Sequence, residues 1–210
     1  MRRAKIGDVY CFKVPNGLKI VQWAYHIPKR GHYIRVFKGL YDSIPTDIEA
    51  IVKAPHCYII AFDIARAYRI GLAQWLGTYA IPKEYPFPKF RISFWKDYKD
   101  EVFSIWLTPN DISATGNMNI ISFTGKSMKD LPDEYQNESL LSDRVSPDWL
   151  LYLFDNNFDL NELRRFWPQA VLGETWEQKF KEYGETVDRA VAENTIGRTG
   201  KTDTKQNQLN

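Results

Sequence analysis

The sequence predicts an α+β fold that is mainly antiparallel β in its first half and helical toward its end. Three observations predict it. Between residues 9 and 107, short β-branched and aromatic runs alternate with turn residues at close intervals. After residue 146, apolar residues recur at the spacing of amphipathic helices. The 210 residues are 44% hydrophobic and 15% aromatic, enough for a sizeable core. We expect a strongly bent sheet or small barrel, followed by a C-terminal helical region packed on it.

The stretch from Ile6 to Trp23 predicts the first hairpin. Two strand-like runs flank Pro15-Asn16-Gly17, and Asn-Gly in that setting favours a type I′ turn, whose two central residues have φ > 0. Strands are expected over 8–14, 18–25, 33–37, 57–63, 73–80, 90–95 and 102–107, with one more in the segment NIISFTG. Strands this closely spaced favour a bent sheet or barrel over βαβ units.

Capping signals predict the first helices. The Thr46-x-x-Glu49 spacing predicts a short helix at 47–53, because the two side chains satisfy backbone amides that the helix leaves free. Ser146-Pro147-Asp148 combines a cap, a proline and an acid at a helix start, and it predicts a helix from there. The segment 64–70 fits either a strand or a helical turn, and we expect a strand.

Two more helices are expected toward the C-terminus. The Asp159-x-x-Glu162 spacing predicts one that ends near Phe166, and a last helix begins near Glu174 and ends at Ile196-Gly197. The last helix carries one apolar stripe, formed by Trp176, Phe180, Tyr183, Val187 and Val191.

The elements divide the chain into three segments. We expect a β-rich domain at 4–125, a helical extension at 126–196 and a disordered tail at 197–210. The tail is polar and low in apolar residues, which is typical of disorder. The apolar stripes of the extension need a surface to cover them, so we expect it to pack on the β-rich domain.

Charge is unevenly distributed along the chain, although the formal net charge is only +2. Residues 1–100 contain 17 Lys and Arg against 8 Asp and Glu, whereas residues 101–184 contain 7 against 14. Two explanations remain open. The two halves attract each other within one fold, or one charged face meets a partner of opposite sign.

The sequence predicts a cytoplasmic protein with no membrane association. Cys11 and Cys57 both lie in apolar runs, which is typical of small buried residues in a reducing compartment. Met1-Arg2-Arg3 is basic, but no apolar signal-peptide core follows it. The longest apolar runs, such as CYIIAF, fall far short of the roughly 20 residues that span a bilayer.

Sequence motifs give no positive case for catalysis. His26, His32 and His56 lack metal-ligand spacing with another His or Cys, and neither CxxC nor HExxH occurs. The sequence also lacks a glycine-rich phosphate loop and a G-x-S-x-G elbow. We therefore expect no enzyme activity, no metal and no cofactor, although a site assembled from scattered residues would escape this search.

Nucleic-acid binding is an alternative. Lys and Arg interleave with aromatic residues in KRGHYIRVF and PKFRISFWKDYK, as in grooves that bind single strands. However, strand alternation places the rings and the basic groups of FRISFW partly on opposite faces, which favours a core role for the rings. A small β-barrel module that binds nucleic acid or peptide remains the second hypothesis, and an uncharacterised enzyme the third.

Three segments carry a resemblance to a known family. They are Ile6-Gly7-Asp8-Val9 with the strand, turn and strand that follow, the stretch IRVFKGLYDSIP, and AQWLGTYAIP with the prolines leading to Phe90. Over residues 4–95 the chain resembles the immunity protein 26 family of bacterial polymorphic toxin systems. The resemblance implies a largely β, barrel-like domain that neutralises a cognate toxin, often a nuclease, by binding it without catalysis or cofactor.

The signature residues of these segments have structural interpretations of their own. Gly7 and Asp8 precede a strand, and we expect a turn in which the Asp8 carboxylate accepts backbone N–H groups. Gly77 leaves room for a close neighbour or a bend. Trp75 is expected to be a core ring whose indole N–H needs an acceptor.

Two surface patches are candidates for contacting a toxin. The first is the basic turn Lys29-Arg30 with His32, to which we add Trp23 at the end of the second strand. The second is acidic and could mimic phosphates against a basic nuclease; it contains Asp130, Asp133, Glu134, Glu138 and Asp143. The structural alternatives are a soluble hairpin tip and a solvated loop.

Overall fold

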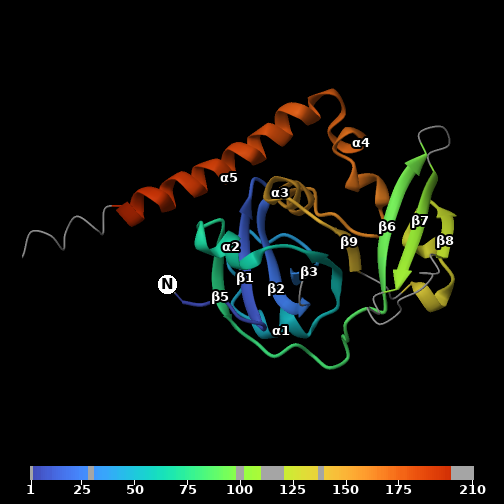
Figure 1. The fold of residues 1–210 in the computed structure, drawn as a ribbon, viewed down its shortest axis with the longest axis horizontal. Coiled ribbons are helices and arrows are strands. Elements are labelled where there is room, and N and C mark those ends of the chain that lie inside the picture. The colour runs from blue at the N-terminus through green and yellow to red at the C-terminus, as the bar shows by residue number, and fades with distance from the viewer. Residues whose placement is uncertain (1, 28–30, 98–101, 110–120, 137–139, 200–210) are drawn as a thin grey trace, which may run out of the picture.

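A computed structural model describes residues 2–27, 31–97, 102–109, 121–136 and 140–199, and its nine strands form one mixed sheet (Figure 1). The order is β5-β1-β2-β3-β4-β9-β6-β7-β8. The strands are β1 (Asp8–Val14), β2 (Gly17–Ile27), β3 (Gly31–Phe37), β4 (His56–Ala61), β5 (Ala73–Thr78), β6 (Phe90–Asp97), β7 (Val102–Pro109), β8 (Ile121–Gly125) and β9 (Leu140–Arg144). The α+β class is confirmed. Across the described strands the sheet is not closed, so it is a bent sheet rather than a barrel.

Helices surround this sheet. The α-helices are α1 (Ile48–Lys53), α2 (Ile64–Arg69), α3 (Pro147–Asp155), α4 (Pro168–Leu172) and α5 (Trp176–Thr199). Short 3-10 turns are η1 (Met128–Asp130), η2 (Asp133–Tyr135), η3 (Leu163–Phe166) and η4 (Gly173–Thr175). Both faces of β1 are buried, because Tyr10 and Phe12 join the main core with α3 while Val9 and Cys11 join a second core with α1.

Strand β9 joins two antiparallel parts of the sheet. It runs parallel to β4, with Ile59 opposite Leu140, and parallel to β6, with Ile92 opposite Leu141. The sequence analysis placed these residues in the helical extension at 126–196 and predicted no strand there, which is wrong for β9. The expected boundary at residue 125 falls between β8 and β9, two strands of the same sheet. We name β6, β7 and β8 the outer lobe; Figure 1 shows it to one side of β1–β5.

The first hairpin is confirmed, but its predicted turn type is wrong. Val14 pairs with Gly17, so the two loop residues are Pro15 and Asn16 rather than Asn16 and Gly17. Gly17 takes a positive φ of 139°, whereas the proline ring holds Pro15 at negative φ and excludes a type I′ turn. The backbone N–H of Asn16 donates to Asp155 Oδ1 at 2.8 Å, which attaches the turn to the end of α3.

The predicted strand at 64–70 is wrong, because this segment forms α2. The Asp63 carboxylate accepts the backbone N–H of Arg66 at 3.0 Å and so caps the helix. Ile64 and Ala67 form its buried side. The signal for the helix was Asp63 at the N-cap, three residues before the amide that it satisfies.

The C-terminal helices differ from expectation at their ends. The helix expected near Phe166 is only the 3-10 turn η3, and α5 continues beyond Gly197 to Thr199. The predicted tail thus contributes residues 197–199 to α5, and 200–210 lie outside the described residues. On the apolar stripe of α5, Tyr183 is buried and its hydroxyl donates to Asp155 Oδ2 at 2.7 Å. Asp155 therefore links the first hairpin, α3 and α5.

Candidate functional site

Two of the predicted partner-binding residues lie together in a groove of about 710 Å³. We call it the basic groove. Its charged and aromatic side chains are Arg2, Arg3, Trp23, His26, His32, Tyr68 and Arg69. They come from the N-terminal segment, from β2 and β3, and from α2. The groove is thus built from segments that are distant in sequence, which is why sequence analysis found only Trp23 and His32 in it.

Strand pairing positions the two histidines of the groove. His26 lies opposite His32 across β2 and β3, with ring centroids 5.2 Å apart. Trp23 is only 7% exposed; its ring lies 4.2 Å from that of His32, and its indole N–H donates to Tyr25 O at 3.0 Å. Burial lowers the pKa of His32, although Asp63, 3.6 Å away, acts in the opposite direction. His32 is therefore mainly neutral at pH 7.

The N-terminal wall of the groove is fixed by Asp8. Its buried carboxylate accepts from Arg2 Nη2 at 2.9 Å, Thr78 Oγ1 at 2.6 Å and Tyr10 OH at 3.2 Å. It also accepts the Lys5 backbone N–H at 2.9 Å, the type of bond expected from the sequence. Burial opposes ionisation of Asp8, but these hydrogen bonds outweigh it and lower the pKa of the carboxyl group.

The expectation that Trp75 is a core ring is wrong. Trp75 lies on the edge strand β5, is 37% exposed and carries the Arg2 guanidinium 4.2 Å above its ring. The two signature glycines both allow a close approach of Tyr79. Gly7 has φ +91°, and a Cβ there would lie 2.9 Å from Tyr79 O; a Cβ on Gly77 would lie 2.6 Å from the Tyr79 ring.

The predicted acidic patch divides into separate roles. Asp130 accepts the backbone N–H groups of Lys126 and Ser127 and completes a capping box at η1, and these bonds lower the pKa of its carboxyl group. Asp133 Oδ1 accepts from Gln136 at 3.1 Å, and Glu134 is exposed beside it on η2.

Four of the predicted residues cannot be placed in a site. Lys29, Arg30 and Glu138 lie outside the described residues. Asp143 belongs to β9, but its side chain is not described.

A second surface, absent from the sequence-based candidates, is the outward side of the outer lobe. Trp95 is 68% exposed and Trp106 is 46% exposed. Trp95 pairs with Ser104 and Trp106 with Ser93, so the two rings are diagonal neighbours on one face. We call this face, with Ser93, Trp95, Ser104, Trp106, Ser122 and Thr124, the outer Trp face.

The opposite face of the same strands is core. Ile92, Ile105 and Leu107 are buried there, and the Phe94 ring lies 4.8 Å from that of Phe166. The expectation that aromatic rings in FRISFW face inward therefore holds for Phe94 and is wrong for Trp95. Strict alternation along β6 could have predicted that Trp95 faces outward, because Ile92 and Phe94 face the core.

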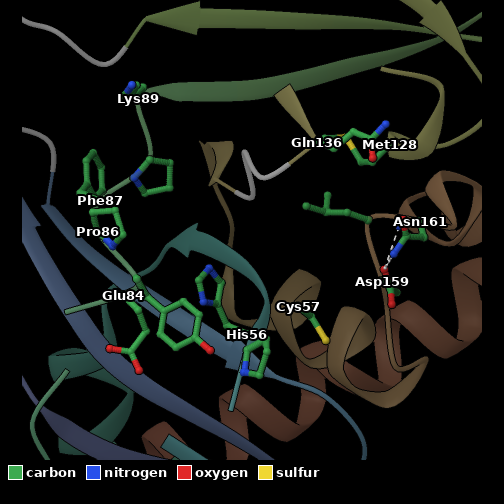
Figure 2. Close-up of a pocket in the computed structure, with 14 residues that line it drawn as sticks. His56, Cys57, Glu84, Pro86, Phe87, Lys89, Met128, Gln136, Asp159 and Asn161 are labelled. Carbon is green, nitrogen blue, oxygen red and sulfur yellow. Dashed lines mark hydrogen bonds between the residues drawn. The ribbon is translucent and has the colours of Figure 1, made fainter. Parts of the chain in front are cut away.

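A third feature is a pocket of about 590 Å³ between the two parts of the sheet (Figure 2). Figure 2 shows Glu84 to Lys89 on one side, Met128, Gln136, Asp159 and Asn161 on the other, and His56 and Cys57 between them. The size suits a small ligand.

Burial and hydrogen bonding control the protonation of His56 and Cys57 and the position of Asp159 in this pocket. Arg35 Nε donates to His56 Nδ1 at 3.3 Å, so the His56 proton lies on Nε2; burial, with the Arg35 charge, lowers the His56 pKa to about 4. Burial raises the pKa of the Cys57 thiol. Asp159 Oδ1 accepts the backbone and side-chain N–H groups of Asn161, at 2.8 and 2.9 Å. The pocket therefore presents a neutral His56 imidazole and a protonated Cys57 thiol.

The described residues also bear on metal and membrane binding. Within the residues that the structure describes, no three His, Cys, Asp or Glu side chains are grouped so as to hold a metal ion. Over the same residues, no helix combines the length and the apolar character needed to cross a bilayer. Both cysteines are free.

Comparisons with protein-family models, with curated proteins and with solved structures gave no match to this chain. The candidate surfaces are therefore interpreted from their own geometry.

Proposed function

We propose that this chain is an immunity-type protein that binds a cognate bacterial toxin in the cytoplasm and blocks it without catalysis. The observation that carries the proposal is the outer Trp face. Trp is among the residues that contribute most to binding energy at protein interfaces, because a large ring buries much area and loses little conformational freedom. Two adjacent tryptophans exposed on a paired sheet are costly to leave in water unless a partner covers them.

The outer lobe presents these rings on a rigid support. β6 and β7 pair without interruption from Phe90–Pro109 to Asp97–Val102, and β8 pairs along the far side of β7. Behind them, Phe103 stacks on Trp167 at 5.0 Å, and Ile105 is fully buried. A surface that is ordered before binding loses less entropy on association, which favours tight binding of a protein partner.

Charge favours a protein over a nucleic acid as the occupant of this face. Surfaces that bind single strands combine stacking rings with a basic groove that follows the backbone. Arg91 lies beside the outer Trp face, on the same side of β6 and two residues before Ser93, and it is the one charged side chain described on that side of the three strands. The six residues of the face itself are tryptophan, serine and threonine. A near-neutral face with central aromatics and a hydroxyl-rich surround matches protein interfaces better.

Rescue and binding assays test the proposal, with a candidate toxin domain taken from the genes that flank this one. Cells that express the toxin domain should survive when they also produce this chain. The double substitution Trp95→Ala with Trp106→Ala should abolish rescue and weaken binding about 100-fold or more, since each ring is expected to contribute roughly 2 kcal/mol. Trp75→Ala is the matched control, because it removes an exposed tryptophan from the opposite edge of the sheet.

Two results would contradict the proposal. One is equal toxin affinity in the wild-type protein and the Trp95/Trp106 double variant. The other is salt-sensitive binding of bulk RNA or DNA through these rings, which would support the nucleic-acid alternative. A nuclease is the toxin class that the resemblance suggests, and inhibition of its activity in vitro would identify it.

A further inference from the structure

We infer that the basic groove binds a nucleoside phosphate. This inference concerns a surface separate from the outer Trp face and is independent of the proposed toxin binding. Three features carry it: the charge of the groove, the fixed geometry of one wall and the size of the space.

The groove is positively charged on two sides. Arg3 approaches from the N-terminal segment and Arg69 from α2, and both side chains are exposed. Arg69 Nε donates to Ala65 O at 3.3 Å and so orients the side chain. This bond does not use the two outer nitrogens of the guanidinium. No Asp or Glu is among the described side chains that line the groove. Arginine is the preferred residue for binding phosphate, because its planar fork donates two parallel hydrogen bonds.

The wall that contains Arg2 is preorganised. Its guanidinium is held by Asp8 and Thr78 on one side and by the Trp75 ring at 4.2 Å on another. The Asp8 carboxylate balances the Arg2 charge, so the net attraction for an anion comes from Arg3 and Arg69. The role of Arg2 is to fix the edge against which a ligand would lie.

The inner part of the groove offers rings rather than charge. His26, His32 and Tyr68 line it beside Trp23. His32 Nδ1 is buried and faces Asp63 Oδ1 at 3.6 Å, and Asp63 does not line the groove, so His32 offers its ring rather than this nitrogen. These aromatic rings suit stacking against the face of a nucleobase.

The volume of the groove suits a ligand of about one nucleotide. At about 710 Å³ it lies within the range of small-molecule sites, and it is an open groove bordered by the N-terminal segment, β2, β3 and α2. A phosphate toward Arg3 and Arg69 with the base toward His32 would use both the charge and the rings.

Calorimetric titration of the full chain at low salt tests the inference. The probes are ATP, inorganic pyrophosphate and adenosine, which separate the contributions of phosphate and base. We expect saturable 1:1 binding of ATP, weaker binding of pyrophosphate and the weakest binding of adenosine. Arg3→Ala with Arg69→Ala should weaken ATP binding at least tenfold, since charge-assisted hydrogen bonds are lost.

Controls separate the groove from general charge effects. Arg164→Ala removes an exposed arginine from η3, outside the groove, and should leave the ATP affinity within about twofold of wild type. His32→Ala removes a ring on which the base would stack; it should weaken ATP binding and leave pyrophosphate binding unchanged. Circular dichroism checks that each variant is folded.

Three outcomes would overturn the inference. One is the absence of saturable ATP binding in folded wild-type protein, and another is equal affinity in the wild type and the Arg3/Arg69 variant. The third is tighter binding of a 20-nucleotide oligonucleotide than of ATP, with a steep salt dependence. That result would mean that the groove belongs to a surface that binds nucleic acid.

Discussion

At the scale of single residues, one buried arginine organises the interior beside β3. Arg35 is fully buried and donates to Gln22 Oε1, to two backbone carbonyl groups and to His56, while its guanidinium lies between the Phe37 and Tyr85 rings. Alternation along β3 indicates which residues share its face, but it does not reveal that a charged side chain points into a core. The acceptors come from three separate segments, so the sequence alone could not predict them.

His56 makes stability depend on pH. Its pKa is about 4 in the folded chain and near 6.5 when unfolded, so the unfolded state binds the extra proton first. The stabilisation is complete above pH 6.5 and is lost as pH falls toward 4. Lowering the pH from 7 to 5 should therefore reduce the free energy of unfolding by about 2 kcal/mol through His56. Urea denaturation of wild type and His56→Gln at both pH values measures it.

The variant should lose about 2 kcal/mol less than wild type over this interval. Parallel losses in wild type and His56→Gln would show that the depressed pKa is wrong.

At the scale of elements, local sequence signals were sufficient to predict the strands that are long and that pair with their neighbours in sequence. β1, β2, β3, β6 and β7 follow from alternation and turn residues. The helices α1 and α3 lie where capping patterns predicted them, but the predicted Thr46–Glu49 box is wrong, because Asp47 caps α1 and accepts the Ala50 N–H, and the Ser146 side chain makes no capping bond at α3. β9 could not be predicted in this way. It has five residues, LLSDR, with little β-branched character, and its partners β4 and β6 lie far away along the chain. Tertiary pairing decides its structure.

We therefore expect β9 to hold the two parts of the sheet together. Leu141 is 3% exposed and pairs with Ile92 of β6. Together with Ile60 of β4 it lines a small cavity between the two parts of the sheet. Leu141→Ala should reduce the unfolding free energy by about 2–5 kcal/mol, because it leaves a cavity between them. Urea unfolding followed by tryptophan fluorescence and by far-UV circular dichroism measures the change.

Both probes should shift together if β9 makes one cooperative unit of the sheet. Leu172→Ala, at a half-buried position on α4, serves as the control and should cost clearly less. A loss below about 1 kcal/mol in Leu141→Ala would mean that β9 contributes little to joining the two parts.

At the scale of the whole molecule, the uneven charge along the sequence corresponds to an uneven arrangement in space. The basic groove is built from the N-terminal segment, β2, β3 and α2, whereas the exposed acids Asp133 and Glu134 belong to η2 beside the outer lobe. Figure 1 places the N-terminus and α2 on one side of the molecule and β6, β7 and β8 on the other. The sequence predicted the uneven charge, but not that Trp95 and Trp106 lie on the outer lobe, across the molecule from the basic groove.

This separation predicts that the two proposed ligands bind independently. A sheet with continuous pairing and a packed core has no second arrangement of its strands that a ligand in the groove could favour, so little coupling energy is expected. The toxin affinity should change by less than about twofold when ATP is saturating, which corresponds to a coupling of roughly 0.4 kcal/mol or less. Interferometry with immobilised toxin domain, with and without ATP, measures it. Hydrogen exchange should show protection of β6 and β7 by the toxin, and of β2, β3 and α2 by ATP. A tenfold effect of ATP on toxin affinity, or protection of the same strands by both ligands, would mean that one surface serves both.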